Sequence, residues 1–389
     1  MRRARSTGTA AGGIDAASTE DFLAATRIDA RPPKVDVGLD ETGLIAYTSG
    51  TTGMPKGAML TYGNALYKTS VSSDGYGVTG DDVLLAVAPL YHIAGMLMGI
   101  NVAVYAGATT VLLFRFDARA AMQAIERHRV TSWYGFAPMN VAAMQLSDIG
   151  DFDLSSLRVN PVTSYGIRFT ETIARRWREY APNCLSFEAA YGLSETHTMD
   201  TYMPADAIHW GTHGRPVPGN EIRIADPASG APRAVGESGE ILVRGPGVFR
   251  GYLDRPEATA KALRDGWLHT GDIGHLDEAG YLTFEGRLKE MIKVSGYGVF
   301  PDEVESILAR HPAVAQAGVI GMPDAQRGEI PKAFVVLKTG AGGSVTEDEI
   351  VQWARENMAA YKAPREVVFC ESLPATGSGK MLRRLLKDH

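Results

Sequence analysis

The chain has 389 residues, a formal net charge of −6 and a pI near 5.9, with Lys and Arg scattered along it. This length predicts two or three domains around a sizeable core, and the mildly acidic balance argues against a nucleic-acid partner. The two cysteines, Cys184 and Cys370, fit neither a disulfide framework nor a metal cluster. They suit a reducing compartment, so a cytoplasmic location is expected.

The opening residues 1–36 are rich in small and polar residues, and no apolar segment follows their arginines. They do not have the pattern of a secretory signal. We expect a disordered or vestigial segment here.

The first motif is YTSGTTGMPKG, Tyr47 to Gly57, which follows an expected short buried strand, Leu44 to Tyr47. Hydroxyl groups and backbone N–H groups of such a loop can converge on an anion, and its lysine adds a point charge. The spacing is not that of a Walker loop, and a polar surface turn is the alternative interpretation. An amphipathic helix with Asn64 near its start is expected next. The candidate phosphate-binding residues are Thr48, Ser49, Gly50, Thr51, Thr52 and Lys56.

Residues 83–114 carry no charged side chain and exceed the ~20 residues that a membrane-spanning helix needs. Proline and glycines interrupt them, so a buried strand–helix–strand unit is the better interpretation. His92 lies in this stretch, where it is either a satisfied core histidine or a site residue. Beyond a helix within 116–130, the aromatic residues Trp133, Tyr134 and Phe136 are either core or the wall of a pocket.

Two further motifs follow: YGLSE, from Tyr191 to Glu195, and GWLHTGD, which ends at Asp272. From Gly211 the chain turns to short alternating strands separated by Gly and Pro, which predicts a small β-barrel or distorted sheet. Within it, Asp272 is either a ribose ligand, a common task of acidic residues, or a β-turn residue. Arg287 is the expected partner on the same ribose.

The last hundred residues have an α/β pattern of their own: a hairpin, a helix starting at Pro301, and then a strand, a helix and a strand. Lys380 follows in a Gly-Ser-Gly loop. We therefore predict an α/β protein with four parts: residues 1–36; an α/β subdomain, 37–209; a β-rich subdomain, 210–287; and a C-terminal domain, 288–389.

The three motifs together resemble the signatures of adenylate-forming enzymes, which include acyl-CoA synthetases, peptide-synthetase adenylation domains and beetle luciferases. The resemblance runs from about residue 36 to the C-terminus. It implies a large α/β N-terminal domain with a β-barrel-like subdomain and a mobile α+β C-terminal domain. Such enzymes have a longer segment before the phosphate loop, so we expect a truncated large domain whose exposed apolar face leads to self-association or instability.

The resemblance also implies roles. The loop grips ATP phosphates, Tyr191 and Gly192 lie at adenine, Ser194 reaches the α-phosphate, and Glu195 binds Mg²⁺. His92 lies between the ATP and acyl sites. Ser164–Gly166 takes the place of the turn that contacts adenine and the acyl chain.

In the C-terminal part, Lys289 takes the place of the family's hinge residue. Lys380 is the cation that bridges the attacking carboxylate and the phosphate. Rotation about Lys289 then exchanges Lys380 for a loop in which Lys293, Ser295 and Gly296 meet CoA. Relatives have Gln or Asn where Gly298 stands here.

Amino-acid-activating relatives carry an Asp near His92, and residues 83–114 contain none, which favours a carboxylic acid with an apolar body. The expected function is an acyl-CoA synthetase for fatty or other hydrophobic acids, with ATP, Mg²⁺ and CoA. Three alternatives stay open: transfer to a carrier-protein phosphopantetheine, a catalytically impaired nucleotide- or acyl-binding homologue, and a luciferase-like oxidation.

Overall fold

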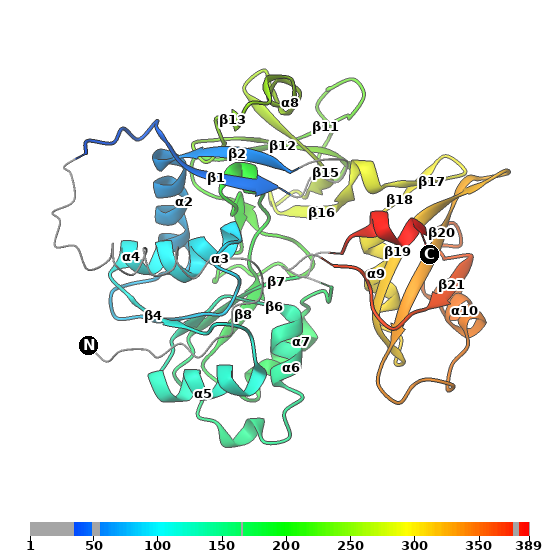
Figure 1. The fold of residues 1–389 in the computed structure, drawn as a ribbon, viewed down its shortest axis with the longest axis horizontal. Coiled ribbons are helices and arrows are strands. Elements are labelled where there is room, and N and C mark those ends of the chain that lie inside the picture. Colours follow the sequence, from blue (N-terminus) through cyan, green and yellow to red (C-terminus); the bar gives the residue numbers. More distant parts are fainter. Residues whose placement is uncertain (1–34, 49–54, 165, 376–380, 389) are drawn as a thin grey trace, which may run out of the picture. The chain divides into compact units, whose positions relative to one another are not determined.

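A parallel sheet of short strands forms the centre of the first α/β part in the computed structural model, which describes residues 35–48, 55–164, 166–375 and 381–388 (Figure 1). The strand order is β4-β3-β5-β7-β6, and β8 also pairs with β7. Every pair is parallel. The strands are β3 (Val83–Ala86), β4 (Thr109–Leu112), β5 (Ser132–Trp133), β6 (Gly135–Phe136), β7 (Val159–Thr163) and β8 (Leu185–Glu188).

Helices cover both faces of this sheet, as parallel strands require. Leu85 of β3 packs in a core with helices α5, α6 and α7, whereas its neighbour Leu84 packs in a second core with η1 and α4. The strand–helix–strand unit predicted between residues 83 and 114 is confirmed. No helix in the described part is long and apolar enough to cross a membrane. The helices are α2 (Tyr62–Gly75), α3 (Ile93–Met96), η1 (Leu97–Asn101), α4 (Val102–Ala106), α5 (Ala118–His128), α6 (Ala137–Ala143), η2 (Ile149–Asp151), α7 (Glu171–Arg178) and η3 (Ser194–Thr196).

The first motif joins two antiparallel strands, β1 (Thr42–Thr48) and β2 (Lys56–Thr61), and β2 also pairs with β13 (Gly251–Tyr252). The expectation that the first strand is buried is wrong: Ile45 is 40% exposed, because β1 is an edge strand with one partner. The following helix starts at Tyr62, where the hydroxyl of Thr61 accepts a hydrogen bond from the Asn64 N–H.

The predicted β-rich region is present. Its main sheet has the order β11-β12-β15-β14, with β16 paired to β15. Ala58 and Leu60 of β2 share a core with Ile241 and Val243 of β12. This core includes residues from both sides of the predicted boundary at residue 210. The boundary itself stays a prediction. The elements are β9 (Thr201–Tyr202), β10 (Arg215–Pro216), β11 (Glu221–Ala225), β12 (Gly239–Arg244), α8 (Pro256–Ala262), β14 (Leu263–Arg264), β15 (Trp267–Leu276) and β16 (Leu282–Arg287).

The C-terminal part has one sheet, order β18-β17-β20-β19, with β21 added parallel to β20. Its own core includes Val319 and Val335 of the sheet and Ile350 of α10. The predicted hairpin, helix and strands are all observed. The elements are η4 (Leu288–Glu290), β17 (Ile292–Val294), β18 (Tyr297–Val299), α9 (Pro301–Leu308), β19 (Val314–Asp324), β20 (Gly328–Leu337), α10 (Glu347–Asn357), β21 (Glu366–Phe369) and η5 (Arg383–Asp388).

Candidate nucleotide and acyl site

Several candidate site residues in the described part follow strands at one edge of the parallel sheet. Because the strands run in the same direction, the segments that follow β3, β6, β7 and β8 leave from the same edge. Those segments carry His92, the start of α6, Ser164 and Tyr191 respectively. Open α/β sheets bind their ligands at this carboxyl edge.

A cavity of about 190 Å³ opens at this edge. Tyr134 and Phe136 lie in its wall, whereas Trp133 is fully buried in the core. The pocket-wall interpretation therefore holds for Tyr134 and Phe136 and the core interpretation for Trp133. Tyr134 and Thr163 place their hydroxyl oxygens 3.0 Å apart in the wall. The described lining contains no acidic side chain and no Lys or Arg; it consists of Tyr76, Pro89, His92, Ala94, Leu97, Met98, Tyr134, Phe136, Thr163, Ala189, Ala190, Gly192, Thr198 and Met199.

His92 is exposed at the mouth of this cavity, so its interpretation as a core histidine is wrong. Its Nδ1 accepts a hydrogen bond from the Ala94 N–H at 3.3 Å and caps α3. The ring therefore has a fixed place beside the cavity. Its role between the two sites stays a prediction.

Tyr191, Asp272 and Arg287 form a connected group. The Tyr191 hydroxyl donates to Asp272 Oδ2 at 2.9 Å, and its ring stacks on Phe284 with centroids 6.0 Å apart. Asp272 lies opposite Arg287 in the β15–β16 ladder, with Arg287 Nε 3.2 Å from Asp272 Oδ1. The β-turn interpretation of Asp272 is therefore wrong, and the pair predicted from two separate motifs is adjacent in space.

Burial and neighbouring charges shift the pKa values of two members of this group, Arg287 and Tyr191. Burial opposes the charge of Arg287, but Asp272 and other nearby groups outweigh it, so its pKa lies above the ordinary value. Burial, followed by the Asp272 charge, raises the pKa of Tyr191 well above its usual range. Tyr191 thus stays a hydroxyl donor to the carboxylate at neutral pH.

Glu195 and Lys56 meet at Tyr252. The Tyr252 hydroxyl donates to Glu195 Oε1 at 2.7 Å, and Lys56 Nζ lies 4.1 Å from the centroid of the same ring. Burial lowers the pKa of Lys56 from its ordinary value. The lysine of the first motif and the carboxylate of the second are thereby brought to one place.

The donor set at this place suits Mg²⁺ in a nucleotide site. Among the described residues, no group of three His, Cys, Asp or Glu side chains could hold a metal ion. Mg²⁺ commonly uses one or two carboxylates together with substrate phosphates. Glu195 alone therefore fits as the protein's carboxylate ligand.

The remaining candidates from the first two motifs, and Lys380, have different outcomes. Ser49, Gly50, Thr51, Thr52 and Lys380 lie outside the described residues, whereas Thr48 and Lys56 face each other across β1 and β2. A Cβ at Gly192 would lie 2.3 Å from Met199 N, so the chain's own backbone requires this glycine. Ser194 begins η3 after Leu193, so it is not the cap of that turn.

Three predicted CoA-site residues belong to the β17–β18 hairpin. Lys293 is exposed in β17, and its N–H donates to Glu329 Oε2 at 2.8 Å. Ser295 and Gly296 form the two-residue turn with φ of 50° and 87°, the left-handed conformation of tight hairpin turns. Lys289 lies in η4 just before the hairpin. Their roles at CoA and at the hinge stay predictions.

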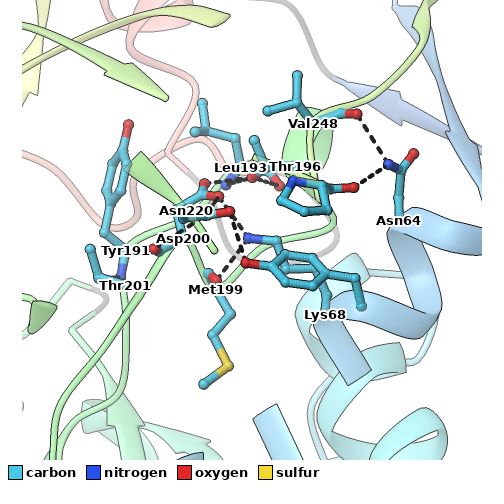
Figure 2. A network of polar contacts seen from close by, with 12 residues as sticks. Asn64, Lys68, Tyr191, Leu193, Thr196, Met199, Asp200, Thr201, Asn220 and Val248 are labelled. Atoms are coloured by element: carbon cyan, nitrogen blue, oxygen red, sulfur yellow. Dashed lines mark hydrogen bonds and ion pairs between the residues drawn. The ribbon is translucent and has the colours of Figure 1, made fainter. Parts of the chain in front are cut away.

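Sequence reasoning missed three buried charged residues near the site. Glu188 accepts hydrogen bonds from the Ser164 N–H, at 2.9 Å, and from its hydroxyl. Burial raises the pKa of Glu188 to about 7. Lys68 and Asp200 pair at 2.7 Å beside Thr196 (Figure 2). The signal for Glu188 was an acidic residue in an otherwise uncharged stretch, LSFEAA, whose first four residues form β8.

Comparison with known proteins places these features in a family. A model of AMP-binding enzymes matches residues 4–253, and a model of the AMP-binding enzyme C-terminal domain matches residues 303–380. A feruloyl-CoA synthase of Amycolatopsis sp is 40% identical over 362 residues, covering 91% of this chain and 71% of that protein. A long-chain-fatty-acid–CoA ligase of Salmonella typhimurium is 34% identical over 360 residues, covering 91% and 63%.

Solved structures agree with the sequence comparison. The o-succinylbenzoate coenzyme A synthetase of Bacillus subtilis, in complex with ATP and a magnesium ion, matches with a TM-score of 0.83 at 32% identity. The match covers 95% of this chain and 74% of that one. The chain therefore belongs to the AMP-binding, adenylate-forming enzyme family.

Proposed function

We propose that this protein activates a hydrophobic carboxylic acid with ATP and transfers the acyl group to CoA. The proposal is carried by the meeting of the motifs: Lys56 and Glu195 at Tyr252, and the Asp272–Arg287 pair, beside an uncharged cavity. The feruloyl-CoA and fatty-acid–CoA relatives support the same reaction class.

In the first step, an oxygen of the acid's carboxylate attacks the α-phosphorus of ATP, the bond to the β-phosphate bridging oxygen breaks, and pyrophosphate leaves. Asp272 and Arg287 hold the ribose, and Lys56 faces the phosphates. Glu195 would hold Mg²⁺, which would supply charge neutralisation at the phosphates when it is bound. Lys380 reduces the repulsion between the two anions as they meet.

In the second step, the CoA thiol loses its proton and its sulfur attacks the carbonyl carbon of the acyl-adenylate. The carbon–oxygen bond to AMP breaks, which yields the thioester and AMP. Lys293, Ser295 and Gly296 are proposed to meet CoA, and Lys289 to be the residue about which the C-terminal part turns between the steps.

The cavity supports a compact acid. Its volume of about 190 Å³ lies below the roughly 300–1,000 Å³ of drug-sized ligand pockets. Its described lining has no carboxylate for a substrate ammonium and no Lys or Arg for a second substrate carboxylate. We therefore place aromatic and short aliphatic acids ahead of the long-chain fatty acids that the sequence alone favoured.

An ATP–pyrophosphate exchange assay tests this function. The panel contains cinnamic and benzoic acids, fatty acids of increasing length, an amino acid and a dicarboxylic acid. We expect exchange with a compact hydrophobic acid, and thioester formation when CoA is added. The proposal is contradicted if the amino acid is the only acid of the panel that supports exchange. It is also contradicted if none of the acids supports exchange although ATP binds.

Lys380→Ala tests the role of the C-terminal lysine. We expect the adenylation rate to fall by at least about a hundredfold while ATP affinity stays within about threefold, because the lysine acts mainly in the transition state. Lys387→Ala, at an exposed lysine of η5, is the matched control. Equal rates for the two variants would remove Lys380 from the mechanism.

A further inference from the structure

Lys68 and Asp200 form an ion pair that is closed off from solvent. Lys68 Nζ lies 2.7 Å from Asp200 Oδ1, and both side chains are 0% exposed. Lys68 comes from α2, the helix that follows the first motif, whereas Asp200 comes from the loop after Glu195. Figure 2 shows the two groups facing each other across the space between helix and loop.

The pair is bonded to the segment that carries Tyr191 and Glu195. The Thr196 hydroxyl donates to Asp200 Oδ2 at 2.5 Å, and its oxygen accepts from the Leu193 N–H at 3.2 Å. The Asp200 N–H donates to the Tyr191 carbonyl at 2.7 Å. Asp200 therefore closes the loop on both sides of the YGLSE motif (Figure 2).

Lys68 also holds a part of this loop with an unfavourable backbone. His197, Thr198 and Met199 have φ of 56°, 60° and 50°, a left-handed conformation that is unfavourable for residues other than glycine. Lys68 Nζ donates to the Met199 carbonyl at 2.8 Å. Without this hydrogen bond, the backbone of the three residues could return to a more favourable conformation. The Tyr191–Thr196 turn, which precedes them, would then shift as well.

The rigid end of the connection is α2. Asn64, one turn before Lys68, donates through Nδ2 to the Pro246 and Val248 carbonyls at 2.6 and 3.1 Å. The Phe249 N–H donates in turn to the Glu195 carbonyl at 2.8 Å. Hydrogen bonds therefore connect α2 to the 246–249 segment, and that segment to Glu195.

Stability alone does not explain the pair. Taking two charges out of water costs as much as, or more than, their attraction returns, and apolar replacements of buried pairs are often neutral. What the charged pair supplies here is a fixed distance between α2 and the loop.

We propose that Lys68 and Asp200 are positioning residues, which fix the Tyr191–Thr196 turn relative to α2 so that Glu195 meets Mg²⁺·ATP. The proposal rests on the proposed function for its kinetic effect. Its binding effect is independent of the acid and of CoA.

Two variants test it. Lys68→Met/Asp200→Asn removes both charges together, and Thr196→Val keeps the ion pair but cuts its bond to the turn. We expect each to lower kcat of the exchange reaction about tenfold or more, and to weaken ATP binding in the presence of Mg²⁺ by a similar factor. Without Mg²⁺, ATP affinity should change by less than threefold. The free energy of unfolding is measured for each variant beside the kinetics.

The control is Arg158→Met/Asp82→Asn. This pair also joins a buried carboxylate to a cation, at 3.1 Å, but it precedes β3 and β7 and so lies at the opposite edge of the sheet. It should leave kcat and the Mg²⁺ effect unchanged.

The outcomes separate cleanly. If Thr196→Val and the double variant both bind Mg²⁺·ATP as tightly as the unmodified protein, the positioning role is wrong. If the double variant does not fold, Thr196→Val decides alone. If the unmodified protein binds ATP but none of the acids in the panel supports pyrophosphate exchange, the proposed function is wrong. Calorimetric titration of ATP with and without Mg²⁺ still decides the role of the pair.

Discussion

At the scale of single residues, the site depends on pairs that come from distant parts of the chain. Asp272 and Arg287 are the clearest case. They form an ion pair, and the Tyr191 hydroxyl donates a hydrogen bond to the Asp272 carboxylate. Glu195 and Lys56 are joined in the same manner by Tyr252. Replacing one member of such a pair should weaken nucleotide binding more than it weakens binding of the acid.

Asp272→Asn tests the ribose assignment. We expect ATP and AMP affinity to fall roughly 10- to 100-fold, because a hydrogen bond to a charged group contributes about 1.5–3 kcal/mol. Calorimetric titration of AMP measures this loss. Asp226→Asn, at an exposed turn whose carboxylate pairs with Arg233 at 2.7 Å, should bind AMP unchanged; equal affinities for both variants would dismiss the ribose contact.

At the scale of elements, the chain end is fastened to α9 by one arginine. Arg383, in η5, donates to Asp302 and Glu305 of α9 at 2.7 Å each and also to Glu290 of η4. Burial opposes its charge, but the bond to Glu305 and the nearby carboxylates outweigh this and raise the pKa of Arg383. Lys380 lies three positions before Arg383 in the sequence, so we expect loss of this anchor to affect it.

Arg383→Met should therefore lower the free energy of unfolding of the C-terminal part by about 1–3 kcal/mol, because the partly buried carboxylates of Glu290 and Glu305 are left without a cation. Urea unfolding and hydrogen exchange of α9 measure this loss, and the adenylation rate should fall with it. Arg384→Met, at the exposed neighbour, is the matched control. An unchanged α9 exchange rate in Arg383→Met would contradict the anchor.

At the scale of the whole molecule, stability depends on histidines that must stay neutral. His197 is fully buried, and neither ring nitrogen has a hydrogen-bond partner in the described part. Burial lowers its pKa to about 4. His213 behaves similarly, since its Nδ1 accepts from the Phe284 N–H and burial lowers its pKa to about 4. Glu188 acts in the opposite direction, because its raised pKa of about 7 favours the folded state at lower pH.

His197→Asn isolates one of these contributions. Between pH 6.5 and 4 the unfolded chain binds a proton that folded His197 refuses, so the unmodified protein loses stability as pH falls. The variant lacks this loss and should gain on the unmodified protein by on the order of 3 kcal/mol across that range. Above pH 7 the difference should be constant. Urea unfolding at several pH values checks this, with the exposed His128→Gln as control; a pH-independent difference would show that His197 is not held neutral.

Much of this protein could be predicted from local pattern. The strand–helix–strand unit, the β-rich region and the C-terminal hairpin and helix follow from periodicity and turn residues, which act over a few positions. The motifs indicated the family and paired Asp272 with Arg287. The burial of β1 was predicted wrongly, because whether a strand lies at an edge depends on its partners and not on its own residues.

What the sequence by itself determined was the set of nucleotide motifs and, through them, the family. Only the tertiary structure decided that Lys56 and Glu195 share Tyr252, that Tyr134 and not Trp133 lines the cavity, and that Lys68 faces Asp200. The physical reason is range. A motif states its chemistry within a few residues, whereas Lys68 and Asp200 are 132 positions apart and acquire a meaning only when folding removes both from water.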